Sequence, residues 1–174
     1  EAPHRAVRRA GRVSGRTIVN TCRYSQMGRA RGVVRLPGGQ GIELKPDGAV
    51  AQRDHSWGLR MGVGQPESGV QELDISSFMG MMINWGVAQF GDWGLHYYLI
   101  EKDDGRIQHL TGAVLPSLEC PGPAVPIEKV EHDFVYHPGS LRMKSGRVMM
   151  HAADGRKLEV HLKELCPMYL RGGG

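Results

Sequence analysis

Residues 147–163, RVMMHAADGRKLEVHLK, decide the fold class of this chain. Apolar and polar residues alternate in the second half of the stretch, so that Leu158, Val160 and Leu162 fall on one face of an extended strand. The Asp154-Gly155 pair between the two runs is a strong signal for a tight hairpin turn. The stretch therefore predicts two antiparallel strands whose three aliphatic side chains face inward together.

The same period of two, interrupted by turn residues, runs through the rest of the chain. Asp103-Asp104-Gly105 predicts a hairpin between strands 93–101 and 106–114, and Pro46-Asp47-Gly48 predicts one between 41–45 and 49–53. Further strands are expected at 16–23, 29–36, 71–78, 81–89 and 127–137. About ten strands, no convincing helix and 25 glycines predict an all-β protein. Antiparallel closure into a barrel is the simplest architecture, because it removes exposed strand edges.

Length and composition describe one domain, residues 1–174, with 40% hydrophobic and 23% charged residues. Within it we expect a basic N-terminal segment, 1–15, and a glycine tail, 172–174. No apolar run reaches the roughly 20 residues that span a bilayer, so stable membrane insertion is not expected. Three cysteines without C-x-x-C spacing fit neither a disulfide framework nor a zinc site, which predicts a cytoplasmic location.

The formal net charge of +4 comes mainly from arginines among the first 35 residues. The sequence favours a solvated basic segment, with a patch that binds phosphate or carboxylate as the alternative. A single aromatic residue, Tyr24, stands among these arginines along the chain, which is too few for a row of stacking residues. We therefore expect no nucleic-acid partner.

The densest informative cluster is residues 53–60, RDHSWGLR. If the cluster is extended, His55 and Trp57 share one face and Asp54 takes the other. An imidazole beside an indole suits a pocket, because His55 can move a proton near neutral pH and Trp57 can stabilise a cation. The alternative is that Trp57 is core packing and His55 a hydrogen-bonded buried group. Arg53 and Asp54 could pair with each other or with Arg60.

Three segments together resemble a known family. RDHSWG at 53–58, WGVAQFGDWG at 85–94 and DGR at 104–106 are similar to motifs of the lipocalin-like superfamily. That superfamily includes the carotenoid 1,2-hydratases (hydroxyneurosporene synthases), attachment-protein-like domains and lipocalin-like cyclases and Diels–Alderases. The resemblance covers residues from about Ser25 to Val114. It implies an antiparallel lipocalin-like barrel of about eight to ten strands, either alone or as one half of a two-barrel protein.

The resemblance also implies a site. His55 and Trp57 match the residues that line the pocket of the hydratases, where an acid on the next strand is thought to protonate the alkene. That strand departs from the family pattern, because Met82 and Asn84 stand where tyrosine and aspartate would be expected, and Asp92 follows only at a turn. The departure puts olefin hydration itself in doubt.

Two functions follow. The first is a lyase or isomerase that acts on a terpenoid or polycyclic substrate by proton transfer, such as hydration, dehydration or cyclisation, without a redox cofactor. The second is a non-catalytic protein that binds or carries a hydrophobic ligand. Neither needs a metal, although His55 and His96 could form a site across strands. A second copy or a companion lipocalin-like domain is the expected protein partner. The catalytic candidates are His55, Trp57, Asp54 and Asp92, and the substrate-binding candidates are Arg53, Arg60, Met82, Asn84, Trp85, Gln89, Trp93 and His96.

Overall fold

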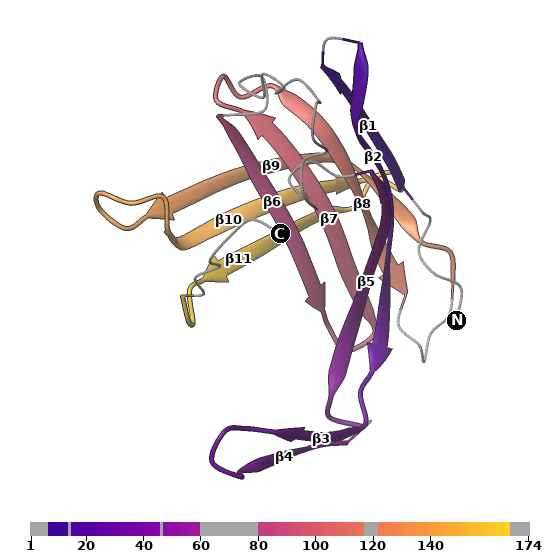
Figure 1. Ribbon diagram of the computed structural model, residues 1–174, viewed down its shortest axis with the longest axis vertical. Helices are drawn as coiled ribbons and strands as arrows, with labels where there is room; N and C mark the ends of the chain where they lie inside the picture. Colours follow the sequence, from indigo (N-terminus) through magenta and orange to yellow (C-terminus); the bar gives the residue numbers. More distant parts are fainter. Residues whose placement is uncertain (1–6, 14, 46, 60–79, 117–121, 168–174) are drawn as a thin grey trace, which may run out of the picture.

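The computed structural model describes residues 7–13, 15–45, 47–59, 80–116 and 122–167. These residues form eleven strands and no helix, which confirms the predicted all-β class (Figure 1). The strands are β1 (Val7–Val13), β2 (Arg16–Arg29), β3 (Gly32–Arg35), β4 (Gly41–Leu44), β5 (Val50–Leu59), β6 (Met81–Gln89), β7 (Trp93–Lys102), β8 (Ile107–Pro116), β9 (Val125–Tyr136), β10 (Met143–Ala152) and β11 (Lys157–Lys163).

The largest unit is a six-stranded antiparallel sheet in the order β11-β10-β9-β8-β7-β6. The sheet curls, so that β9–β11 cross behind β6–β8 as half of a barrel (Figure 1). Two of its connections are the hairpins predicted at 103–105 and 154–155, and both are confirmed. In each turn an aspartate accepts a hydrogen bond from the backbone N–H two residues later, at Arg106 and Arg156, and a glycine at positive φ completes the turn.

The main hydrophobic core fills the concave side of this curl. Leu95, Tyr97 and Leu99 of β7 are buried there against residues of β8–β10 such as Met150. Leu158, Val160 and Leu162 pack against the same core, while their neighbours along β11 are exposed. The predicted inward face of this strand is therefore confirmed.

A second sheet, in the order β1-β2-β5, is built mainly from the N-terminal third of the chain. Residues 7–13 of the basic segment expected at 1–15 form β1 and pair with β2 from Val7↔Arg23 to Val13↔Arg16. Alternation of apolar and polar residues is weak in this stretch. Its strand structure depends on the hydrogen bonds that β2 supplies.

The hairpin predicted at 46–48 is wrong. A turn is present, since the Gly48 and Ala49 N–H groups donate to the Lys45 carbonyl. However, β4 pairs with β3, and β5 pairs with β2 over ten residue pairs from Arg29↔Val50 to Asn20↔Leu59. The four-residue β4 offers few hydrogen bonds, whereas β2 offers a ladder along the whole of β5, so the long-range pairing prevails over the local turn.

The β1-β2-β5 sheet packs on the convex side of β6–β8, opposite the main core. Ser25 of β2 contacts His96 there, and Ile100 and Ala113 are fully buried between the two layers. The described strands thus form three hydrogen-bonded sheets, and the curled half-barrel of six strands is consistent with the predicted antiparallel barrel. The strand predicted at 71–78 lies outside the described residues.

Candidate functional site

The register of β5 on β2 determines which way the side chains of residues 53–59 point. Tyr24 is paired with His55, and Cys22 with Trp57, while Arg23 is paired with Ser56. Paired residues of an antiparallel ladder share a face, and successive residues alternate. His55 and Trp57 therefore share one face, as predicted, and Asp54 lies on the other.

The face that carries His55 and Trp57 is turned away from the six-stranded sheet, and we call it the outer face. Trp57 is 47% exposed and His55 is exposed as well. The Tyr24 and Trp57 rings each flank His55 at centroid distances of 5.4 Å, and the Arg53 guanidinium lies 5.5 Å from the centre of the Tyr24 ring. The predicted orientation into a cavity is wrong, because alternation reveals which side chains share a face but not which face becomes covered.

The opposite, inner face of β2 and β5 holds a partly buried arginine. The Arg23 guanidinium lies 4.9 Å from the centre of the Trp85 ring and 5.1 Å from that of Tyr98. Its Nε is 3.3 Å from a carboxylate oxygen of Asp54. Asp54 was expected to pair with Arg53 or Arg60. Arg53 is on the outer face, and Arg60 lies outside the described residues. The Arg23 contacts join both sheets.

Beside Arg23, a buried pair of polar side chains links the same two sheets. His96 Nε2 is 2.9 Å from the Trp85 indole nitrogen and 3.1 Å from the Ser25 hydroxyl. An indole N–H can only donate, so His96 Nε2 accepts the hydrogen bond from Trp85. The β2–β5 sheet separates this histidine from His55, so the two histidines do not form the metal site considered above.

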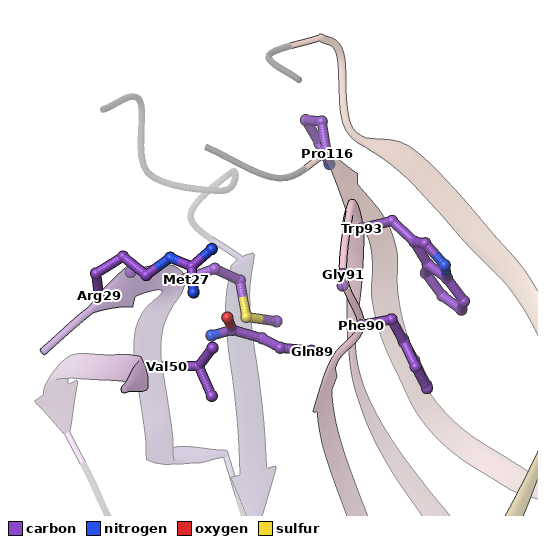
Figure 2. Close-up of a pocket in the computed structure, with 10 residues that line it drawn as sticks. Met27, Arg29, Val50, Gln89, Phe90, Gly91, Trp93 and Pro116 are labelled. Carbon is purple, nitrogen blue, oxygen red and sulfur yellow. The ribbon is translucent and has the colours of Figure 1, made fainter. Parts of the chain in front are cut away.

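A cavity of about 280 Å³ opens at one end of the interface between the two sheets. Met27 and Val50 line it from β2 and β5, with Gln89 and Pro116 opposite, and Arg29 lies at its edge (Figure 2). The Gln89 amide donates to the Ala51 carbonyl over 2.7 Å and so bridges the β5 and β6 edges. Figure 2 shows that the Phe90 and Trp93 rings, which stack on each other, turn away from the cavity centre.

Met27 separates this cavity from the buried Ser25–His96 pair. A Cβ atom at Gly94 would lie 3.2 Å from the Met27 terminal methyl carbon, so the glycine leaves room for the thioether against the backbone of β7. Ser25 lies two residues before Met27 on β2, and His96 lies two residues after Gly94 on β7, so each shares a face with its neighbour. The cavity wall beside Ser25 and His96 is thus apolar.

The remaining predicted site residues are dispersed. Met82 and Asn84 face the main core, on the opposite side of β6 from Trp85. Asp92 is exposed in the turn between β6 and β7. Of the eleven predicted residues that the structure describes, only Gln89 and Trp93 line the cavity. Asp54 and Trp85 contact Arg23, and His96 contacts Trp85.

Arg23, Ser25 and Met27 were missed by the sequence analysis. They alternate along β2 and form its inner face, which contacts β6 and β7. A period-two reading of residues 23–27 could have placed them together, but arginine and serine do not mark a buried face. Their partners come from residues about 60 to 70 positions away.

The buried hydroxyl of Tyr97 has a raised pKa, which a titration can test. Its hydroxyl donates to Asn84 Oδ1 over 3.1 Å, and burial raises the pKa of the phenol above its usual 10.0. Because the folded state holds this proton more tightly, the contribution to the free energy of unfolding is fully present below pH 10.0 and is lost as the pH rises through the raised pKa. We expect wild-type protein to keep a protonated tyrosine above pH 10.0 that Tyr97→Phe lacks. Ultraviolet absorbance of tyrosinate measures it. Identical titration curves would contradict the prediction.

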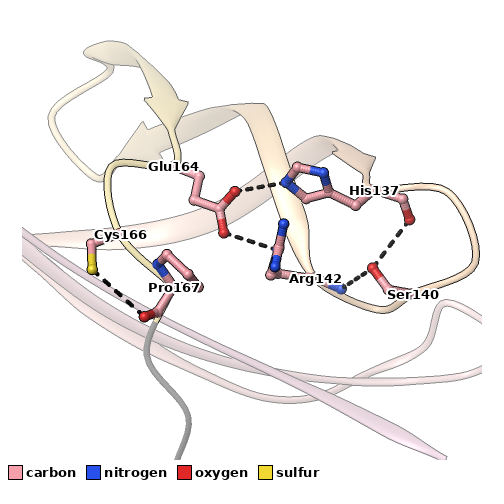
Figure 3. Close-up of polar contacts among 6 residues, drawn as sticks. All are labelled: His137, Ser140, Arg142, Glu164, Cys166 and Pro167. Atoms are coloured by element: carbon pink, nitrogen blue, oxygen red, sulfur yellow. Dashed lines mark hydrogen bonds and ion pairs between the residues drawn. The ribbon is translucent and has the colours of Figure 1, made fainter.

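Other polar clusters are structural contacts between strands. The carboxylate of Glu164, which follows β11, lies 2.6 Å from His137 Nε2 and 3.1 Å from Arg142 Nε. Both partners belong to the β9–β10 connection (Figure 3). Ser140 closes that connection by donating to the His137 carbonyl. Among the described residues, no three histidine, cysteine, aspartate or glutamate side chains are grouped as metal ligands. Nor does the described part of the chain contain a helix able to cross a membrane.

Comparison with known proteins gives one result. A family model described as a family of unknown function, DUF8625, matches residues 2–174. The chain belongs to this family. The matched residues include all eleven strands described above. No curated protein and no solved structure matches the chain.

Proposed function

We propose that the protein binds a small, mostly apolar molecule in the cavity between its two sheets. The observation that carries the proposal is the lining itself, which combines Met27, Val50 and Pro116 with one charged side chain, Arg29, and one amide side chain, Gln89. Ligand pockets are typically concave and apolar with a few placed polar groups, and about 300 Å³ is the lower end of their usual volumes. Arg29 at the cavity edge favours a ligand with an anionic or carbonyl end.

Ligand binding in the cavity fits the geometry better than proton-transfer catalysis at His55 on β5. A general acid must come within hydrogen-bond distance of the substrate atom that it protonates. His55 and Trp57 are on the outer face, whereas the cavity lies on the inner side of β2 and β5. The lyase or isomerase function predicted from the resemblance therefore stays a prediction without a site, and storage or transport of an apolar ligand is the proposal.

The test fills the cavity with a larger side chain. Anilinonaphthalene sulfonate, an apolar anion, should bind wild-type protein at this cavity and fluoresce. Val50→Trp places an indole where Val50 lines the cavity, and we expect it to weaken binding by about tenfold or more, which corresponds to about 1.4 kcal/mol. Isothermal calorimetry measures the affinity, and dye fluorescence confirms it.

Val135→Trp is the matched control. Val135 on β9 is 53% exposed and Val50 is 56% exposed, but only Val50 lines the cavity. We expect Val135→Trp to bind the dye as the wild type does. Equal binding by both variants, or no dye binding by folded wild-type protein, would refute the cavity proposal.

A further inference from the structure

We propose that the outer face of β2 and β5 is a binding site for single-stranded nucleic acid. The face carries an aromatic strip, Tyr24, His55 and Trp57, in which each ring approaches the next at a centroid distance of 5.4 Å. Exposed aromatic rings on a sheet form platforms on which bases stack without sequence preference. The strip is invisible along the chain, because strand pairing brings Tyr24 next to residues about 30 positions later.

Charge complementarity favours a polyanion as the partner. The strands β1, β2 and β5 contain seven arginines and a single acid, Asp54. That acid is on the inner face, paired with Arg23, so β2 and β5 present no carboxylate on the outer face. By contrast, β6–β11 contain six basic and five acidic residues. The basic excess of the protein is therefore concentrated in the sheet that carries the aromatic strip. Within that sheet Arg23 and Arg29 lie on the inner side, and Arg53 is on the outer face with the strip.

Arg53 places a cation within the strip rather than beside it. Its guanidinium lies 5.5 Å from the centre of the Tyr24 ring, on the same face as His55. In this position it can contact a phosphate while a base stacks on the neighbouring rings. The exposed Trp57 indole is the largest stacking surface of the strip.

Single strands suit this geometry better than a duplex. Stacking on a protein ring requires an exposed base face, which a duplex hides within its own stack. The 5.4 Å spacing of the rings also exceeds the roughly 3.4 Å between bases stacked in one strand, so it matches bases that are splayed apart. A second copy of this chain is disfavoured on the same face, because it would bring two Arg53 cations together while β2 and β5 present no carboxylate there to pair with them.

The experiment measures fluorescence anisotropy of a labelled oligothymidylate of about 16 nucleotides at low salt. We expect Trp57→Ala to weaken binding about tenfold and Trp57→Phe to retain most of the affinity, since phenylalanine still stacks. Quenching of tryptophan fluorescence by unlabelled oligonucleotide should disappear in Trp57→Phe. Arg53→Gln should weaken binding and reduce the slope of log affinity against log salt concentration by about 0.7.

Matched controls separate stacking from general attraction. Tyr136 on β9 is an aromatic residue with 42% exposure, and Tyr136→Ala should bind the oligonucleotide as wild type does. Val50→Trp should also bind it normally, so failure of the cavity proposal and failure of this one are distinguishable. Circular dichroism of each variant checks folding, and His55→Ala provides a second stacking variant if Trp57→Ala does not fold.

Three results would overturn the proposal. The first is no oligonucleotide binding by wild-type protein at low salt. The second is equal affinity for wild type, Trp57→Ala and His55→Ala, which would mean attraction by charge alone. The third is Trp57-dependent binding to vesicles of phosphatidylserine and phosphatidylcholine without oligonucleotide binding, which would identify the face as a membrane-surface site.

Discussion

Replacing Gly58 by alanine is expected to destabilise the protein by roughly 3 kcal/mol, although the change adds a single methyl group. Gly58 has a φ of +115°, a conformation that side chains other than hydrogen strain. A Cβ atom there would lie 2.1 Å from the backbone carbonyl oxygen of Asn20. The carbonyl belongs to β2, so relief of the clash requires β2 and β5 to separate where they pair. Denaturant unfolding followed by circular dichroism measures the loss.

Gly28→Ala is the control within the same ladder. Gly28 pairs with Ala51, has no atom within 4 Å of an added Cβ, and does not have a positive φ. We expect the free energy of unfolding to change by at most about 0.5 kcal/mol. If both variants lost the same stability, the close approach to the Asn20 carbonyl would not be the reason for a glycine at position 58.

Arg23→Ala is expected to lower the free energy of unfolding by about 2 to 3 kcal/mol. The substitution removes the guanidinium from the Trp85 and Tyr98 rings and leaves Asp54, 25% exposed, without this cation. Arg23→Lys should restore only part of the loss, because an ammonium group cannot lie flat between two rings. Denaturant unfolding followed by tryptophan fluorescence measures it.

A surface arginine provides the comparison for Arg23. Arg156 pairs with Asp154 in an exposed hairpin turn, and such pairs contribute little because water screens them. Arg156→Ala should therefore change stability much less than Arg23→Ala. The double variant Arg23→Ala/Asp54→Asn should cost less than the sum of the two single changes, because each single change leaves a charge unpaired. Additive costs would show that Arg23 and Asp54 do not depend on each other.

The C-terminal half of the fold was predictable because its signals are local. The Asp104-Gly105 and Asp154-Gly155 turns each join strands of clear period two, so turn chemistry and alternation agree. The strand at 81–89 was predicted with its observed bounds. Where the signals were weaker the prediction failed. The turn near Gly48 does not make a hairpin, because β4 pairs with β3 and β5 pairs with β2.

The candidate site was less predictable than the fold. Alternation predicts that His55 and Trp57 share a face, and the unusual His-Trp pair suggests that this face points inward. In the structure Arg23, Ser25 and Met27 cover the neighbouring sheet instead. Gln89 and Trp93 do line the cavity, but the residues opposite them come from β2 and β5, far away along the chain.

What the sequence alone determined is the strand content, two hairpins, and the division of each strand into two faces. These depend on the backbone period and on turn residues, which act within a few positions. The tertiary structure decided which face of β5 is covered, that β5 pairs with β2, and that Arg53 lies on the same face as an aromatic strip. Those outcomes depend on contacts between residues about 30 to 70 positions apart. Alternation is symmetric between the two faces of a strand, so only packing against a second sheet distinguishes them.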